Sequence, residues 1–196
     1  MSNKLILAST SPYRRELLAR LRLPFEVVSP GVDEAERDGE LPADLAIRLA
    51  FEKANAVAMR FPNEIIIGAD QVAVIDCRLL SKPLTHENAI AQLRAVRGRR
   101  VSFLTAIAIV QRSTGRSSTR LVPCQVDFRP YPEEIIEPYL LAERPYDCAG
   151  AAKIEGLGIA LVERIEGDDP TALIGLPLIA LIDMLGDLGC KVLPPR

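Results

Sequence analysis

The sequence predicts an α/β domain built on a mixed sheet flanked by helices. Short β-branched segments alternate with helical ones, which is typical of this fold class. Two long apolar segments joined by a polar linker favour an antiparallel hairpin within the sheet. The composition, 48% hydrophobic and 26% charged residues, is that of a globular protein. At 196 residues, with no shift in composition between its halves, the chain is predicted to form a single domain over residues 1–196.

The predicted strands are apolar segments rich in β-branched residues. They cover Leu5–Leu7, Phe25–Val28, Glu64–Ile67, Gln71–Ile75, Val101–Val110, Arg120–Phe128 and Gly158–Glu163. The predicted helices follow the 3.6-residue apolar period or carry capping residues. They run from Pro42 until Phe61-Pro62 stops the pattern, from Thr85 as N-cap to Arg97, over Glu133–Leu141 and over Leu176–Leu188. The polar linker 111–118 joins the two longest strands, so the sheet should contain both parallel and antiparallel pairs.

Charge and cysteine content exclude several classes of protein. A net charge of −2 argues against a nucleic-acid-binding surface and a polybasic membrane surface. The four cysteines lie far apart, and His86 is the one imidazole, which disfavours a zinc site and a Ser-His-Asp triad. No signal segment or apolar run of about 18 residues occurs, so we expect reduced thiols, a cytoplasmic location and no membrane partner.

The segment from Leu5 to Arg15 has the pattern of a phosphate-binding turn. It ends an apolar strand, and Ser11 and Pro12 suit the N-cap and the first position of a helix. Arg14 and Arg15 then lie beside the positive end of the helix dipole, which is unfavourable unless an anion joins them. The alternative is a capped amphipathic helix whose arginines are solvated.

Two acidic residues follow predicted strands. Asp70 comes after a buried β-branched run and Gly68, a position suited to ligating Mg²⁺ or activating water; the alternative is a carboxylate that caps a turn. Gln71 next to it would contact a base edge or simply begin the following strand. Glu34 follows the turn Ser29–Gly31 and is a second candidate metal ligand. The alternative is a solvated acidic loop, since Glu36, Asp38 and Glu40 continue the charge.

Two lysines are candidate phosphate contacts. Lys53 lies at the edge of an apolar helical stripe, where a lysine either extends to solvent or, pointed inward, neutralises phosphate charge. Lys82 precedes Pro83, which holds it extended at the entrance of a helix.

Glu155 lies in a glycine-rich segment that either packs against a base, with the acid accepting its hydrogen bonds, or forms a tight loop. The segment Gly167–Thr171 suggests a further helix entry.

Together, these residues form the set expected of a metal-assisted nucleoside triphosphate hydrolase. Ser9, Arg14, Lys53 and Lys82 supply phosphate contacts, and Glu34 and Asp70 supply acids.

With these residues, the sequence closely resembles the Maf nucleotide pyrophosphatases, which are related in fold to the inosine triphosphate pyrophosphatases. The resemblance covers nearly the full chain and implies a mixed sheet flanked by helices around a cleft. The segments that carry it are Leu7–Arg15, Val32–Glu34, Glu52–Ala54, Ile67–Val72, Lys82-Pro83, Tyr146–Gly150 and Gly175–Leu178.

The resemblance implies hydrolysis of a nucleoside triphosphate between the α and β phosphates with Mg²⁺ or Mn²⁺, giving the monophosphate and pyrophosphate. It matches Asp70 to the proton acceptor, and it matches Ser9, Arg14, Glu34, Lys53 and Lys82 to the family's other active-site positions. By their chemistry, Glu34 and Asp70 are the candidate metal ligands and the other four are the candidate phosphate contacts. Three further positions separate a subgroup acting on 7-methyl-GTP from one acting on dTTP and UTP. In this sequence they are Tyr13, Gln71 and Glu155. Gln71 and Glu155 match the 7-methyl-GTP subgroup, whereas Tyr13 stands where that subgroup more typically has tryptophan.

The chemistry of the base agrees with this subgroup. A 7-methylguanine ring is cationic and would stack on Tyr13, a contact worth about 0.5–2 kcal/mol. Glu155 would accept from the N1 and N2 donors, a paired edge that pyrimidines lack. The alternatives are a family member for dTTP, UTP or other modified nucleotides, and a nucleotide-sensing regulator of cell division. Members of the family are often dimers, so the resemblance also implies a homodimer.

Overall fold

The structure, a computed structural model, describes residues 4–193. The chain divides into two compact units. The first contains residues 4–71, 105–122 and 169–193, and the second contains residues 72–104 and 123–168. The expectation of a single domain over 1–196 was drawn from composition alone and stays a prediction.

Seven strands form a mixed sheet, as predicted. Their hydrogen-bonded order is β2-β1-β3-β5-β6-β7, with β4 pairing to β3. β1 pairs in parallel with β2 and β3, whereas β4 and β7 pair in antiparallel fashion with β3 and β6. The strands are β1 (Leu5–Ala8), β2 (Phe25–Val28), β3 (Ile65–Ile75), β4 (Arg78–Leu80), β5 (Arg100–Gln111), β6 (Arg116–Phe128) and β7 (Val162–Glu166).

Two strand predictions were wrong in detail. The segments Glu64–Ile67 and Gln71–Ile75 are one strand, β3, because Gly68 has ordinary extended backbone and the chain continues straight through it. The segment Gly158–Glu163 begins instead as a 3-10 helix, Leu157–Leu161, and β7 starts only at Val162. Gly158 donates to the carbonyl of Lys153 at 3.0 Å, and this tight turn delays the strand.

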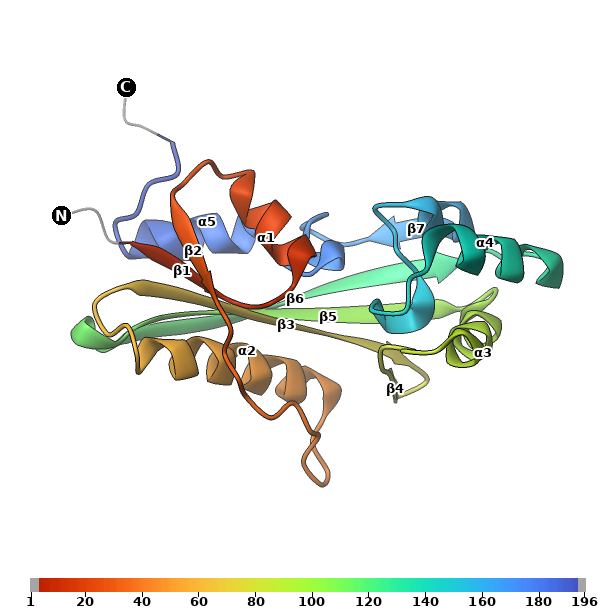
Figure 1. Cartoon of the computed structure of the whole chain (residues 1–196), viewed down its shortest axis with the longest axis horizontal. Coiled ribbons are helices and arrows are strands. Elements are labelled where there is room, and N and C mark those ends of the chain that lie inside the picture. The colour runs from red at the N-terminus through yellow and green to blue at the C-terminus, as the bar shows by residue number, and fades with distance from the viewer. Residues whose placement is uncertain (1–3, 194–196) are drawn as a thin grey trace. The chain divides into compact units, whose positions relative to one another are not determined.

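In the first unit, helices cover both faces of the sheet (Figure 1). α1 (Pro12–Ala19) and α5 (Leu178–Asp187) lie on one face, and α2 (Pro42–Ala58) lies on the other. The α1 and α5 side is a hydrophobic core that includes Leu17 and Leu181 together with alternate residues of β1, β3 and β5. Both faces of β1 and of the Ile65–Ile67 part of β3 are therefore buried, which explains why these segments are continuously apolar.

Gly68 permits the close contact between α2 and β3. A Cβ added at this position would lie 2.3 Å from the carbonyl oxygen of Ala50 and 2.7 Å from the backbone nitrogen of Ala54. These neighbours are helix backbone and cannot move aside as a flexible side chain would. The missing side chain thus allows the helix that carries Lys53 to lie directly against the strand that carries Asp70.

Substitution Gly68→Ala should therefore separate α2 from β3. We expect a loss of about 1–3 kcal/mol in the free energy of unfolding, measured by urea denaturation, because overpacking costs this much in close-packed interiors. The matched control is Gly186→Ala in α5, where nothing lies within 4 Å of an added Cβ. Alanine has the higher helix propensity, so this control should be neutral or stabilising. Equal stability of the two variants would contradict the close-contact argument.

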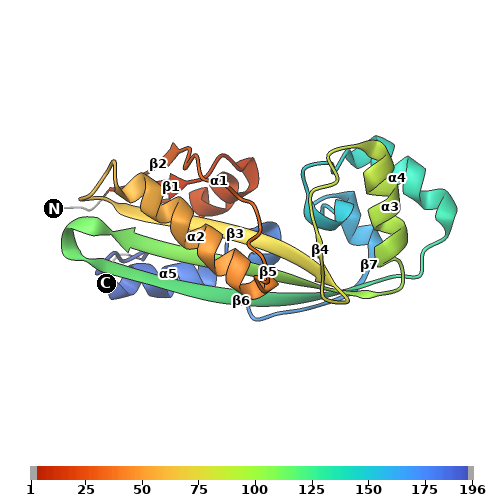
Figure 2. The same ribbon diagram turned by 90° about the horizontal axis from the view of Figure 1, so that it is seen from below.

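The second unit contains the remaining two α-helices. α3 (His86–Val96) and α4 (Ile136–Glu143) pack together, and Figure 2 shows them side by side. The Thr85 hydroxyl caps α3 as predicted, accepting from the Asn88 N–H at 3.2 Å. The helix expected over Glu133–Leu141 starts instead with a 3-10 turn, Glu133–Ile135, and becomes α-helical only from Ile136.

In residues 4–193 no helix is long and apolar enough to cross a membrane. All four cysteines are free thiols.

Candidate functional site

The parallel pairing of β1 with β2 and β3 ends at one edge of the first unit's sheet, where β1 and β2 stop and β3 runs on to Ile75. The last residue of β1, Ala8, pairs with Val28 of β2 and with Gly68 of β3. Ser9 directly follows Ala8, and Asp70 lies two residues after Gly68. The segment that carries Glu34 leaves β2 at the same edge. In α/β sheets, ligands bind in the region outside the carboxyl ends of the strands. The topology therefore brings together candidate residues that are far apart in the sequence.

The turn from β1 into α1 has the predicted geometry. Ser11 is the N-cap, with its hydroxyl accepting from the Arg14 N–H at 3.4 Å, and Pro12 occupies the first turn. The buried hydroxyl of Ser9 accepts from the Ser11 N–H at 3.1 Å. Within residues 4–193 this is the one hydrogen bond of the Ser9 side chain, so its hydroxyl proton is still available to a ligand.

Arg14 turns inward, whereas Arg15 is exposed. The Nε of Arg14 donates to the carbonyl of Gly175 at 2.9 Å, which fixes the guanidinium. In the part of the chain that the structure describes, its two terminal nitrogens make no hydrogen bond. Burial lowers the pKa of Arg14, and the charges of Asp70 and Glu34 oppose that shift. Arg14 is therefore half-buried and held by the Gly175 carbonyl, and the charges of both acids act on its guanidinium.

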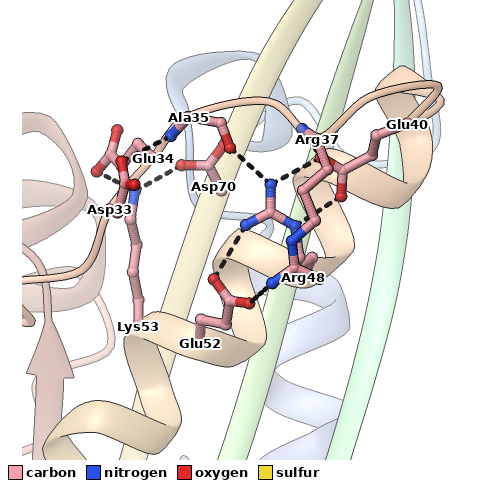
Figure 3. A network of polar contacts seen from close by, with 9 residues as sticks. All are labelled: Asp33, Glu34, Ala35, Arg37, Glu40, Arg48, Glu52, Lys53 and Asp70. Carbon is pink, nitrogen blue, oxygen red and sulfur yellow. Dashed lines mark hydrogen bonds and ion pairs between the residues drawn. The ribbon is translucent and has the colours of Figure 1, made fainter.

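Lys53 connects the two candidate acids (Figure 3). Its Nζ lies 2.6 Å from Asp70 Oδ1 and 2.7 Å from Glu34 Oε1. Lys53 is 4% exposed and Asp70 is 6% exposed, so the alternatives of a lysine that extends to solvent and an aspartate that caps a turn are both wrong. Glu34 is 55% exposed at its side chain. The result is a buried ion pair, Lys53 and Asp70, with the accessible carboxylate of Glu34 at its edge.

Gln71 is held by the backbone of another segment. Its Nε2 lies 2.9 Å from the Ala172 carbonyl and 3.0 Å from the Leu173 carbonyl. It also donates to Thr105 Oγ1 at 2.9 Å, and Thr105 itself donates to Ala172. Because carbonyl oxygens only accept, the amide nitrogen must face them and the amide oxygen points away. Gln71 therefore presents an acceptor.

The segment that holds Gln71 and Arg14 is anchored by Asp169. Its carboxylate accepts from the backbone N–H of Thr171 at 2.9 Å and from that of Ile179, at the start of α5, at 2.7 Å. This agrees with the helix entry that the sequence suggested near Gly167–Thr171. The anchored turn supplies the carbonyls of Ala172, Leu173 and Gly175 to the two side chains.

Tyr13, the second residue of α1, also lies in the first unit and is partly exposed. The last two candidates, Lys82 and Glu155, belong to the second unit. Lys82 is exposed between β4 and α3, and α3 holds the carbonyls on either side of it: Gln92 donates to Ser81 at 2.8 Å and Asn88 to Pro83 at 2.9 Å. The backbone around Lys82 is therefore fixed while its ammonium reaches solvent.

Glu155 is exposed in a turn that Glu143 of α4 fixes at both ends. Glu143 accepts from the Leu157 N–H at 2.7 Å and pairs with Lys153 Nζ at 2.9 Å. The hydrogen bond from Leu157, with a second from Lys153, lowers the pKa of Glu143, so this anchor is ionised at neutral pH. The tight-loop interpretation of this segment is thus correct as local structure, and it leaves the Glu155 carboxylate at the surface.

Several supporting residues were not found from the sequence. Thr105 is the one polar residue of the apolar run 103–110 in β5, a pattern that would have marked it. Arg48 and Glu52 have the i,i+4 spacing of a helical ion pair, and they bind the segment that carries Glu34 (Figure 3). Their partner Glu40 looked like part of a solvated acidic loop, although its side chain is only 9% exposed.

The donor set suits a hard divalent cation only in part. Within residues 4–193 no group of three or more His, Cys, Asp or Glu side chains would hold a metal ion. Glu34 and Asp70, however, direct carboxylate oxygens at the same ammonium group. Mg²⁺ is commonly bound by one or two carboxylates together with substrate phosphates and water, and this pair meets that requirement.

These features define an α/β protein with a cluster of acids and cations at the edge where its parallel strand pairing ends. The family model of the Maf-like proteins matches residues 4–188, and the chain belongs to this family. Two similar proteins are a "7-methyl-GTP pyrophosphatase" of Albidiferax ferrireducens, 55% identical over 98% of this chain and 97% of the other, and one of Methylobacillus flagellatus, 56% identical over 96% and 98%. Among solved structures, the Staphylococcus aureus Ham1 protein is 15% identical, with a TM-score of 0.46 over 65% of this chain and 73% of that one.

Proposed function

We propose that this protein is a nucleotide pyrophosphatase, a hydrolase of phosphorus-containing anhydrides, that converts 7-methyl-GTP to 7-methyl-GMP and pyrophosphate. Family membership and the names of relatives more than 50% identical over nearly the whole chain support this activity. The observation that carries the proposal is the buried Lys53 ammonium between the carboxylates of Asp70 and Glu34.

In this proposal Asp70 accepts the proton of the attacking water. Its Oδ1 is held by Lys53, while its Oδ2 makes no hydrogen bond in residues 4–193 and is available to water. The anhydride bond between the α and β phosphates breaks as the new P–O bond forms, and pyrophosphate leaves. A fixed carboxylate is a suitable general base when it lies within hydrogen-bond reach of that water.

The phosphates would be bound by groups of opposite charge. Ser9 donates its hydroxyl proton, Arg14 its unused N–H groups, and Lys53 and Lys82 their ammonium charges. Glu34 and Asp70 would hold Mg²⁺ or Mn²⁺, which supplies positive charge to neutralise the phosphate oxygens. Within the cluster of Arg14, Lys53, Glu34 and Asp70 the formal charges cancel, so a highly charged polyphosphate needs additional cations.

The base would be recognised by Tyr13, Gln71 and Glu155. Tyr13 offers a ring face to the cationic 7-methylguanine, and Glu155 accepts from the paired N–H donors of guanine. The oriented Gln71 adds an amide acceptor. Pyrimidines would leave such acceptors unpaired, which is a strong form of discrimination.

A nucleotide panel tests this function. The purified protein with Mg²⁺ or Mn²⁺ should release pyrophosphate, with 7-methyl-GTP as its best substrate in kcat/KM among 7-methyl-GTP, GTP, dTTP and UTP. Much faster turnover of dTTP or UTP would contradict the subgroup, and release of orthophosphate would contradict the position of the cleaved bond. A Tyr13→Trp variant with every relative rate unchanged would show that this position does not discriminate between nucleotides.

The homodimer, the cytoplasmic location and the lack of nucleic-acid or membrane partners stay predictions.

A further inference from the structure

Glu34 lies on a segment with no regular structure of its own. Residues 29–41, between β2 and α2, contain neither helix nor strand, and residues 33–39 are all exposed. Such segments sample many conformations unless specific contacts hold them. The position of the Glu34 carboxylate beside Lys53 therefore depends on what fixes this segment.

Arg48, on α2, binds this segment at two points (Figure 3). Its Nε and Nη2 form a bidentate pair with Glu40, at 2.6 Å and 2.7 Å. The same Nη2 donates to the carbonyl of Ala35, the residue after Glu34, at 2.9 Å. The side chains of Arg48 and Glu40 are only 13% and 9% exposed, so the pair is largely shielded from solvent. Bidentate arginine pairs fix geometry as well as contributing energy.

Glu52 extends the anchor and links it to Lys53. It accepts from Arg48 Nη1 at 3.0 Å and from Arg37 Nη2 at 2.8 Å. The Arg37 backbone N–H also donates to Glu40 at 3.1 Å, which closes the network. Glu52 directly precedes Lys53, so α2 holds both the segment and the lysine that Glu34 contacts. We call Arg48, Glu40 and Glu52 the Arg48 clasp.

The clasp is charged at neutral pH. Hydrogen bonds from Arg48 lower the pKa of Glu40 to about 2, and those from Glu40 raise the pKa of Arg48 above its ordinary value. Both shifts favour the ionised pair.

We propose that Arg48 is a positioning residue that, through Glu40 and the Ala35 carbonyl, keeps the Glu34 carboxylate beside Lys53 and Asp70. This rests on the proposed function only in giving Glu34 a role in turnover. The geometric part, that Arg48 orders residues 33–40, stands on the contacts themselves. Arg48 acts through Glu34 and does not itself touch the reacting atoms.

Amide hydrogen exchange, followed by mass spectrometry, tests the geometric part without any activity assay. In Arg48→Met, peptides covering residues 33–40 should exchange at least about tenfold faster at neutral pH, because breaking these contacts frees the segment. Glu40→Gln removes the charged bidentate pair from the other side and leaves the helical Arg48–Glu52 pair intact. It should increase the exchange rate of the same peptides to a similar extent, and it replaces Arg48→Met as the test if that variant folds poorly. Arg94→Met is the matched control, since it breaks an arginine–glutamate pair between α3 and the 3-10 turn Glu133–Ile135. It should leave these peptides unchanged.

A double-mutant comparison tests the positioning role in turnover. Arg48→Met and Glu34→Gln should each lower kcat/KM by about tenfold or more, and the double variant should be no worse than Glu34→Gln alone, since groups that act as a unit are not additive. If Arg48 instead acted independently of Glu34, the fold-loss in kcat/KM of the double variant would be the product of the two single losses. Multiplied losses, or unchanged exchange in both clasp variants, would overturn the proposal. If the wild-type chain hydrolyses no nucleotide, the proposed function fails while the exchange result still decides whether Arg48 orders the segment.

Discussion

Asp70→Asn is expected to lower kcat by about 10²–10⁴-fold while nucleotide binding persists, because loss of a general base has effects of this size. Asparagine keeps the shape of aspartate, and its Oδ1 still accepts from Lys53, so the buried contact at 2.6 Å survives. What it cannot do is take a proton from water at Oδ2. Pyrophosphate release measures the first effect, and titration calorimetry with the same nucleotide and ion measures the second.

Two variants make this test specific. Asp33→Asn applies the same chemical change one residue from Glu34, and asparagine can still cap the Ala35 N–H that Asp33 binds at 3.0 Å. It should keep near-normal rates. Glu34→Gln separates the two acids: if Glu34 chiefly holds the cation, this variant needs more Mg²⁺ for half-maximal rate, whereas Asp70→Asn is slow at any Mg²⁺ concentration. Retention of more than about a tenth of wild-type kcat by Asp70→Asn would exclude a role as the main base.

The local features of the site could be predicted from the sequence because neighbouring residues determine them. Ser11 and Pro12 start α1 where the capping rules place it, and Thr85 does the same for α3. The period of α2 was also clear, and Lys53 lies within its buried stripe. Local pattern left only the direction of the Lys53 side chain open, since a helical edge position is compatible with solvent or with a buried acid.

The remaining features depend on tertiary contacts that no local pattern contains. Gly68 indicated a close approach at the end of a strand. The close approach is that of the α2 backbone, and β3 continues through the glycine. Glu40 looked solvated because its neighbours are charged, yet Arg48, eight residues later, shields it. The orientation of Gln71 depends on the carbonyls of Ala172 and Leu173, about a hundred positions along the chain.

Lys53→Met should destabilise the fold and abolish turnover together. Methionine has a similar length and no charge, so the buried carboxylate of Asp70 loses its ion partner. Removing one member of a buried pair costs about 3–5 kcal/mol, and the half-exposed Glu34, which water still solvates, contributes little of it. We therefore expect the lower end, about 3 kcal/mol in the free energy of unfolding by urea denaturation at pH 7.

The double variant Lys53→Met/Asp70→Asn separates the two losses. It removes the stranded charge, so it should recover a large part of the stability that Lys53→Met loses, whereas pyrophosphate release should not return because both groups are missing. Lys53→Arg keeps the charge that pairs with Asp70, so it should lose less stability than Lys53→Met. It should still be slow, since a planar guanidinium does not fit between two carboxylates only 2.6 Å and 2.7 Å from Nζ. Full stability of Lys53→Met, or no recovery in the double variant, would mean that the buried charge pair does not determine stability here. Turnover lost at normal stability would then assign Lys53 to phosphate binding alone.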